Sequence, residues 1–167
     1  MTDNSYQRLL KLETTPEALE ATVCYLTERM KPFLRTLEKV MILFPDEGPD
    51  SLGAIFAEAV RRCNGEPFFV GSDYRWKTLL RVAFQSHTST IIGHPLVVLG
   101  LMKLAKATGT PLYLYDVIVC GDPFSHWMVD GLKKGLDCRI WGCYAVRSGP
   151  IVAGFSCEQE AGIHIRK

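Results

Sequence analysis

The chain has 167 residues, a formal net charge of +1, and 47% hydrophobic residues against 22% charged ones. This length suffices for one domain with a full core, and the composition is that of an ordinary globular protein. The charge balance provides no basic field for nucleic acid, and no apolar run reaches the roughly 18 residues that cross a bilayer. The first residues, Met1 to Ser5, lack the pattern of a signal peptide, so we expect a cytoplasmic protein.

Helical and strand-like patterns alternate through the first two thirds of the chain. Residues 1–36 are expected to be helical, with Thr15 as a cap and Pro32 as the residue that kinks or ends the helix. The spacing of apolar residues then predicts a strand over 39–44, a helix from 51 to 64, a strand over 67–70, a helix over 73–85, a strand over 89–92 and a helix over 95–107. His94 is interpreted as the residue that begins the last of these helices rather than as a base.

The remaining third continues the alternation. Residues 117–120 predict a buried strand, after which Gly121 permits a sharp turn. A helix is predicted from Pro123 to Gly135, followed by a strand over 138–143 with Tyr144 just past its carboxyl end. Residues 149–155 and 162–165 predict two more strands, antiparallel and at an edge.

This alternation of strand and helix predicts an α/β fold with a mainly parallel sheet and helices on both faces, three-layered and doubly wound. The N-terminal helix is expected to pack on the sheet, with short strands at the C-terminal edge. We expect one domain over 1–167, made of an N-terminal helical segment (1–36) and the α/β part (37–167). Ligands of such sheets bind outside the carboxyl ends of the strands, which are the ends that precede Gly121 and Tyr144.

Two residues at this edge have two interpretations each. Tyr144 is either a platform for a ligand or an aromatic residue that covers the rim of the core. Asp122 either accepts a hydrogen bond from a ligand hydroxyl or caps the helix that begins at Pro123.

The six cysteines show no spacing typical of a disulfide framework, which favours free and buried thiols. Cys157 and His164 have a spacing compatible with zinc, but a structural zinc site takes four ligands, so Cys138 and Cys143 would have to complete it. A catalytic pair of Cys143 or Cys120 with His164 lacks a third, orienting group. We therefore predict no metal site.

An ordered series of short motifs runs through the chain. It comprises Ile-Ile-Gly-His-Pro at 91–95, Gly-Asp-Pro at 121–123, Tyr144 to Ser148, Gly-Pro at 149–150, Cys157, and Gly-Ile-His-Ile at 162–165. In this order the motifs resemble the central part of an adenylate-forming enzyme of the phenylacetate–coenzyme A ligase group. The resemblance covers roughly three-quarters of the chain, from about residue 39 to 165.

The resemblance implies that Tyr144 is a stacking platform for adenine. It also shows departures, because Arg147 stands where the family has a Thr or Ser that contacts phosphate, and Ser148 where it has the Glu that binds magnesium. The family's glycine-rich phosphate loop has no counterpart, since residues 85–90 contain no glycine. The family's lysine-bearing C-terminal domain also has none before the chain ends at Lys167. We therefore expect no adenylation by this chain alone.

Two functions follow from the resemblance. The first is a non-catalytic module, a pseudoenzyme, that binds a ligand such as AMP, ATP or coenzyme A, or another protein. Its predicted ligand-binding residues are Gly121, Asp122, Pro123, Tyr144, Ala145 and Arg147. Arg147 would hold a phosphate or carboxylate without metal. The alternative is one subunit of a split adenylate-forming coenzyme A ligase that needs a partner chain for ATP chemistry.

A part of a larger fold leaves surfaces that other parts cover in the full-length relatives. We therefore expect a homodimer or a partner subunit to cover exposed apolar surfaces, and neither nucleic acid nor a membrane as a partner.

Overall fold

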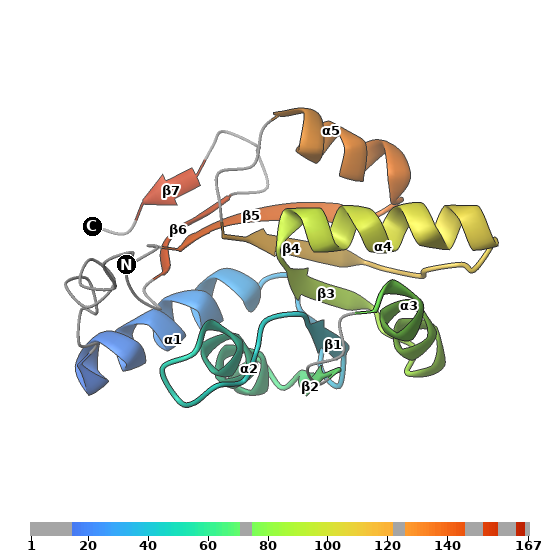
Figure 1. The fold of residues 1–167 in the computed structure, drawn as a ribbon. Helices are drawn as coiled ribbons and strands as arrows, with labels where there is room; N and C mark the ends of the chain where they lie inside the picture. The colour runs from blue at the N-terminus through green and yellow to red at the C-terminus, as the bar shows by residue number, and fades with distance from the viewer. Residues whose placement is uncertain (1–14, 71–74, 122–125, 146–151, 157–162, 166–167) are drawn as a thin grey trace, which may run out of the picture.

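The computed structural model describes residues 15–70, 75–121, 126–145, 152–156 and 163–165. Within these ranges, a seven-stranded sheet has helices on both faces (Figure 1). The strands are β1 (Lys39–Ile42), β2 (Glu66–Phe69), β3 (Thr90–Gly93), β4 (Asp116–Cys120), β5 (Arg139–Ala145), β6 (Val152–Ser156) and β7 (Ile163–Ile165). The helices are α1 (Pro16–Met30), α2 (Leu52–Arg62), α3 (Trp76–Gln85), α4 (Pro95–Thr108) and α5 (His126–Gly135).

The strand order is β2-β1-β3-β4-β5-β6-β7. Strands β1 to β5 pair in parallel, whereas β6 and β7 are antiparallel additions at one edge. The predicted α/β fold, with its mainly parallel sheet and short C-terminal edge strands, is thereby confirmed.

The alternation of side chains along each strand divides the core into two layers. In β1, Val40 and Ile42 pack with α1 and α2, while Met41 packs with α3 and α4 on the opposite face. Figure 1 shows α1 and α2 below strands β4 and β5, and α5 above them. The helices predicted on both faces, including the N-terminal one, are confirmed.

Helix α1 is shorter than the predicted helical segment. The Thr15 side chain caps it by accepting a hydrogen bond from the backbone N–H of Ala18 at 3.2 Å. It ends at Met30, close before Pro32, which has no N–H to continue the helix. Phe33 lies beyond the helix but is still buried, because its ring stacks on Trp141 of β5 at 4.2 Å between centroids.

The amino ends of the strands carry a buried polar network. Asp116, fully buried at the start of β4, accepts hydrogen bonds from the indole N–H of Trp141 at 2.7 Å and from Arg139 at 2.8 Å. Beside it, buried Glu38 accepts from the hydroxyl of Thr90 at 2.6 Å. These carboxylates link the amino ends of adjacent strands, since each accepts from a residue on a neighbouring one.

None of the described helices is both long enough and apolar enough to cross a membrane.

Candidate functional site

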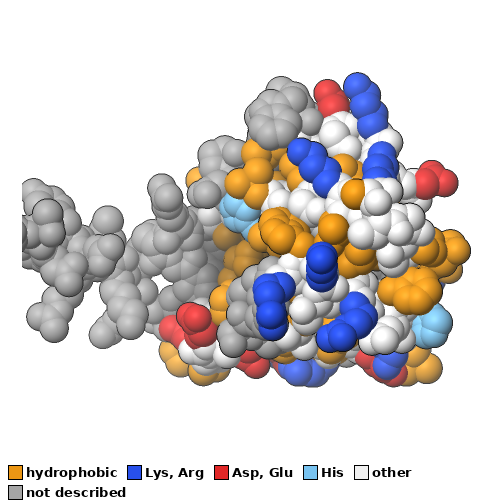
Figure 2. Space-filling view, turned by 45° about the vertical axis from the view of Figure 1, so that its right-hand side comes forward, with side chains coloured by type: hydrophobic (Ala, Val, Ile, Leu, Met, Phe, Trp, Pro, Cys, Tyr) orange, Lys and Arg blue, Asp and Glu red, His pale blue; other side chains and the backbone are white. Residues whose placement is uncertain are grey.

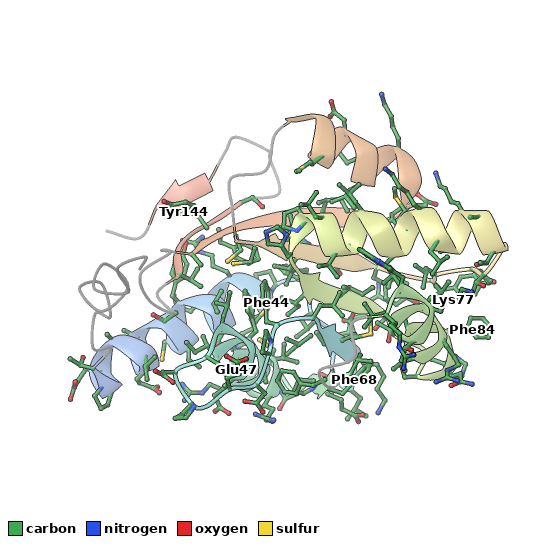
Figure 3. The ribbon with its side chains drawn as sticks, in the orientation of Figure 1. Phe44, Glu47, Phe68, Lys77, Phe84 and Tyr144 are labelled. Carbon is green, nitrogen blue, oxygen red and sulfur yellow. The ribbon has the colours of Figure 1, made fainter. Side chains whose placement is uncertain are left out.

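The carboxyl ends of β1 and β3 form the point where the strand order reverses. From β1 the chain continues into α2 on one face, and from β3 it continues into α4 on the other. In open α/β sheets, ligands bind outside the carboxyl ends of the strands at such a reversal. Phe44 follows β1 there and stacks on Phe56 of α2 at 6.0 Å between ring centroids. In Figure 3, Phe44 and Glu47 lie beside the start of α2.

Close packing fixes the backbone at the end of β1. A Cβ at Gly53 would lie 2.3 Å from the carbonyl oxygen of Pro45, so only glycine permits α2 to approach this turn. The hydroxyl of Ser51 caps the same helix by accepting from the N–H of Ala54 at 3.2 Å. Together these contacts fix the start of α2 against the end of β1.

His94 lies at the centre of this edge. It occupies the N-cap position of α4 with Pro95 directly after it, which confirms the prediction that it begins the helix. Its ring lies against the turn after β4, because a Cβ at Gly121 would be 3.0 Å from His94 Cδ2. Gly121 has φ +121°, a conformation that side-chain-bearing residues rarely adopt. The glycine therefore permits both the turn and the approach of the imidazole.

Tyr144 lies inside β5, not past its end as predicted, because this strand continues to Ala145. The pairing of Cys120 with Cys143 places Gly121 and Tyr144 next to each other at the carboxyl edge. Trp141 and Cys143 belong to the core under α1 and α2, so Tyr144 faces the opposite side of the sheet.

The ring of Tyr144 has glycine on both sides. It follows Gly142 by two residues and pairs with Gly154 of β6, and neither glycine places a side chain beside the ring. Tyr144 is 45% exposed, and Figure 3 shows it at the opposite end of the molecule from Lys77. Ala145 packs against the core on the other face, so it does not share a surface with Tyr144.

The structure tests the remaining predicted residues only in part. Asp122, Pro123 and Arg147 lie outside the described residues, as do Cys157 and the side chain of His164. The capping role of Asp122, the phosphate contact of Arg147 and a metal role for Cys157 stay predictions.

Completion of a zinc site by Cys138 and Cys143 together is wrong. Cys143 lies in the core under α1 and α2, whereas Cys138 packs against the core under α3 to α5. Burial raises the pKa of the Cys138 thiol to about 12, helped by the charges of Asp116 and Asp137. Burial, with a hydrogen bond to Cys120, raises the pKa of Cys143 well above its usual range. The described residues contain no group of three or more His, Cys, Asp or Glu placed to hold a metal ion.

A catalytic pair of a strand cysteine and His164 is also wrong. Cys143 pairs with Phe155, and Phe155 pairs with His164, so one whole strand separates the two residues. Two strand spacings amount to roughly 10 Å, which no hydrogen bond spans. Cys120 lies one strand farther away.

Phe44 and His94, which follow β1 and β3 at this reversal, are not among the predicted ligand-binding residues. Their place at the reversal of strand order depends on β3 pairing with β1 rather than with β2. A Gly-His-Pro sequence after a buried strand is the signal that would have included His94.

The α/β arrangement is similar to one part of several solved ligase structures. No protein-family model and no curated protein matches the sequence.

Solved structures share the fold at low sequence identity. A structure of 2-hydroxyisobutyryl-CoA ligase in complex with 2-HIB-AMP and CoA is 16% identical with a TM-score of 0.72, over 89% of this chain and 33% of that one. The N-terminal domain of FACL13 from Mycobacterium tuberculosis is 7% identical with a TM-score of 0.68, over 87% and 36%. The amide bond synthetase McbA from Marinactinospora thermotolerans is 14% identical with a TM-score of 0.65, over 86% and 28%. The chain thus spans about a third of the length of each structure.

Proposed function

We propose that this chain is a nucleotide-binding module of the phenylacetate–coenzyme A ligase type that holds AMP, ATP or coenzyme A without adenylating an acid by itself. The observation that carries the proposal is the half-exposed ring of Tyr144 at the carboxyl end of β5, next to the turn at Gly121. An aromatic face at this edge, flanked by glycine, suits a flat base. The proposed setting is the cytoplasm.

The chemistry of the edge favours binding over turnover. Adenine stacks on an aromatic ring without a specific partner, and the guanidinium of Arg147, three residues after Tyr144, has the charge to hold a phosphate. Ser148 has no carboxylate for a magnesium ion that bridges ATP phosphates. The module therefore takes up its ligand without a metal ion.

A second candidate is one subunit of a split adenylate-forming coenzyme A ligase. The observation that favours it is length, since the chain spans about a third of each compared structure. In that case a partner chain supplies the phosphate loop and the lysine.

Isothermal titration calorimetry with AMP, ATP, coenzyme A and adenosine tests the proposal. Stacking of a base on an aromatic side chain contributes about 1–3 kcal/mol, so Tyr144→Ala should weaken binding by about 5- to 150-fold. Tyr113→Ala is the matched control, because Tyr113 is 77% exposed and lies in the loop that precedes β4. Arg147→Ala should weaken the phosphate-bearing ligands and leave adenosine unchanged.

The outcomes separate the candidates. Absence of binding by any of these ligands overturns the nucleotide-binding proposal. Pyrophosphate release from ATP and a carboxylic acid by the purified chain overturns the non-catalytic proposal. Release only after addition of a second chain establishes the split ligase.

Self-association is proposed with this function, because several large apolar side chains are exposed on the described surface. They include Leu37, Leu96 and Tyr115. Multi-angle light scattering should give a mass above that of the 18.7 kDa chain. A monomer at micromolar concentration contradicts it.

A further inference from the structure

The outer surface of α3 and α4 is hollowed into a continuous groove. Two adjoining hollows of about 670 and 490 Å³ share Lys77, Arg81 and Leu104. The groove lies away from the nucleotide edge, and Figure 3 shows Lys77 and Phe84 at the opposite end of the molecule from Tyr144. It is therefore a separate surface.

An apolar stripe runs along the groove. Trp76, Leu80 and Phe84 are spaced four residues apart on α3 and so lie on one face of this helix. Trp76 is 42% exposed and Phe84 is 49% exposed, whereas Leu80 between them is only 5% exposed and belongs to the core.

Close contact with α4 holds the indole in place. A Cβ at Gly100 would lie 2.1 Å from the ring of Trp76, so this glycine lets the ring rest directly on the helix. An aromatic side chain that is anchored on one side and open on the other can contact a partner with little loss of side-chain entropy.

A basic stripe runs beside the apolar one. Lys77 and Arg81 are four residues apart, both are exposed, and neither forms an ion pair with any residue that the structure describes. Arg62, by contrast, binds Glu20 and Glu58. No carboxylate of the described residues lines either hollow. Figure 2 shows Lys and Arg side chains set among hydrophobic ones on the face that includes this side of the molecule.

We propose that the α3–α4 groove docks an acidic amphipathic helix of a partner protein. Apolar residues of that helix contact the exposed rings of Trp76 and Phe84, and its Asp or Glu residues pair with Lys77 and Arg81. Helix α3 has ten residues and so offers about 15 Å of length, enough for about three turns of a partner helix.

The two stripes together favour a protein helix over other anions. A nucleic acid would use the cations and leave the apolar stripe uncovered, and the net charge of +1 provides no wider basic field for it. An anionic lipid surface is the remaining possibility and becomes an outcome of the test.

The probe is a displayed library of helical peptides selected for binding to the whole chain, with counter-selection against the charge-reversed variant Lys77→Glu/Arg81→Glu. We expect the recovered peptides to share apolar residues at helical spacing with Asp or Glu beside them. In fluorescence anisotropy, the charge-reversed variant should bind them at least about tenfold more weakly. Phe84→Ala should also weaken binding, with an unchanged dependence on salt.

The matched control is Lys103→Glu/Lys106→Glu, which reverses two exposed charges on α4 that do not line the groove. It should bind the peptides as the native chain does, and so should Tyr144→Ala, which separates this proposal from nucleotide binding. Recovery of no peptide, or of peptides without acidic residues, overturns the proposal. So does an equal loss in the two charge-reversed variants. Binding to phosphatidylglycerol vesicles that needs Lys77 and Arg81, without any recovered peptide, assigns the groove to a membrane surface instead.

Discussion

Removal of the Asp116 carboxylate should destabilise the fold more than any exposed charge does. In Asp116→Ala, the buried indole N–H of Trp141 loses its acceptor, which costs about 1–3 kcal/mol. The Arg139 side chain is 50% exposed and turns to water, so the lost ion pair adds at most about 1 kcal/mol. The free energy of unfolding should therefore fall by about 1–4 kcal/mol, a large share of the 5–15 kcal/mol typical of a domain.

Two comparisons separate the cost of leaving the Trp141 N–H unpaired from the cost of losing the ion pair. In Asp116→Asn, an amide oxygen still accepts from Trp141, so the loss should stay near that of the ion pair, about 1 kcal/mol or less. The exposed pair of Lys39 and Glu66 has side chains 47% and 43% exposed, and Glu66→Ala should likewise cost at most about 1 kcal/mol.

Urea unfolding, followed by far-UV circular dichroism, measures these differences in free energy, provided that the dependence of the unfolding free energy on urea concentration is the same for all variants. In a Trp141→Phe background, Asp116→Ala should cost less by about 1 kcal/mol or more, since no indole donor is left unpaired. The reasoning is refuted if Asp116→Ala unfolds within about 0.5 kcal/mol of the native chain, or if the alanine and asparagine variants are equally stable.

Three further predictions follow from local geometry. Gly53→Ala should lower the free energy of unfolding by about 1–3 kcal/mol, because its Cβ would lie 2.3 Å from a backbone oxygen of Pro45. Gly109→Ala should cost about 1 kcal/mol, because Gly109 has φ +66° but open space around it. Equal urea midpoints of the two variants contradict this prediction. The pKa of Glu20 is lowered to about 2, chiefly by its hydrogen bond from Arg62, so the stabilisation of the fold by this ion pair is present above pH 4.5 and is lost as the pH falls towards 2. The difference in melting temperature between the native chain and Glu20→Gln should therefore shrink over that range, and a constant difference would argue against a stabilising Glu20–Arg62 pair. The pKa of the exposed Cys24 thiol is raised by its hydrogen bond to Glu20, so Glu20→Gln should increase the fraction of reactive thiolate at pH 8. In a Cys157→Ser background, this variant should speed the labelling of Cys24 by a thiol reagent, and slower labelling would contradict the hydrogen bond to Glu20.

The order of secondary structure was predictable because its signals are local. Four-residue apolar runs such as Val117–Cys120, bounded by Gly121, indicate strands buried on both faces. Thr15, Pro16 and Pro32 mark the start and end of α1 through cap geometry and a missing N–H. Each of these signals depends on residues only a few positions apart.

The contacts that escaped prediction join distant parts of the chain. Asp116 directly precedes the apolar run of β4, and its burial depends on Trp141, twenty-five residues later and on the next strand. The aromatic contact of Phe33 with the same indole joins the segment after α1 to β5, far later in the chain. The place of Tyr144 within β5 follows from the extent of that strand, which the sequence placed two residues short. Strand order, register and strand length decide these contacts, and none of them has a local signal.

The stabilising polar contacts and the candidate binding residues lie at opposite ends of the strands of this sheet. The cross-strand side-chain pairs that involve a carboxylate gather, among the described residues, at the amino ends, where Asp116 meets Arg139 and Trp141, Glu38 meets Thr90, and Lys39 meets Glu66. The carboxyl ends instead present glycine and aromatic residues, with Gly121 against His94 and Tyr144 half-exposed. Because Tyr144 takes no part in the amino-end network, its truncation should leave the urea midpoint nearly unchanged while it weakens nucleotide binding. A Tyr144→Ala variant as unstable as Asp116→Ala would mean that the ring supports the core. That result would contradict the proposal that Tyr144 and Gly121 form a binding surface.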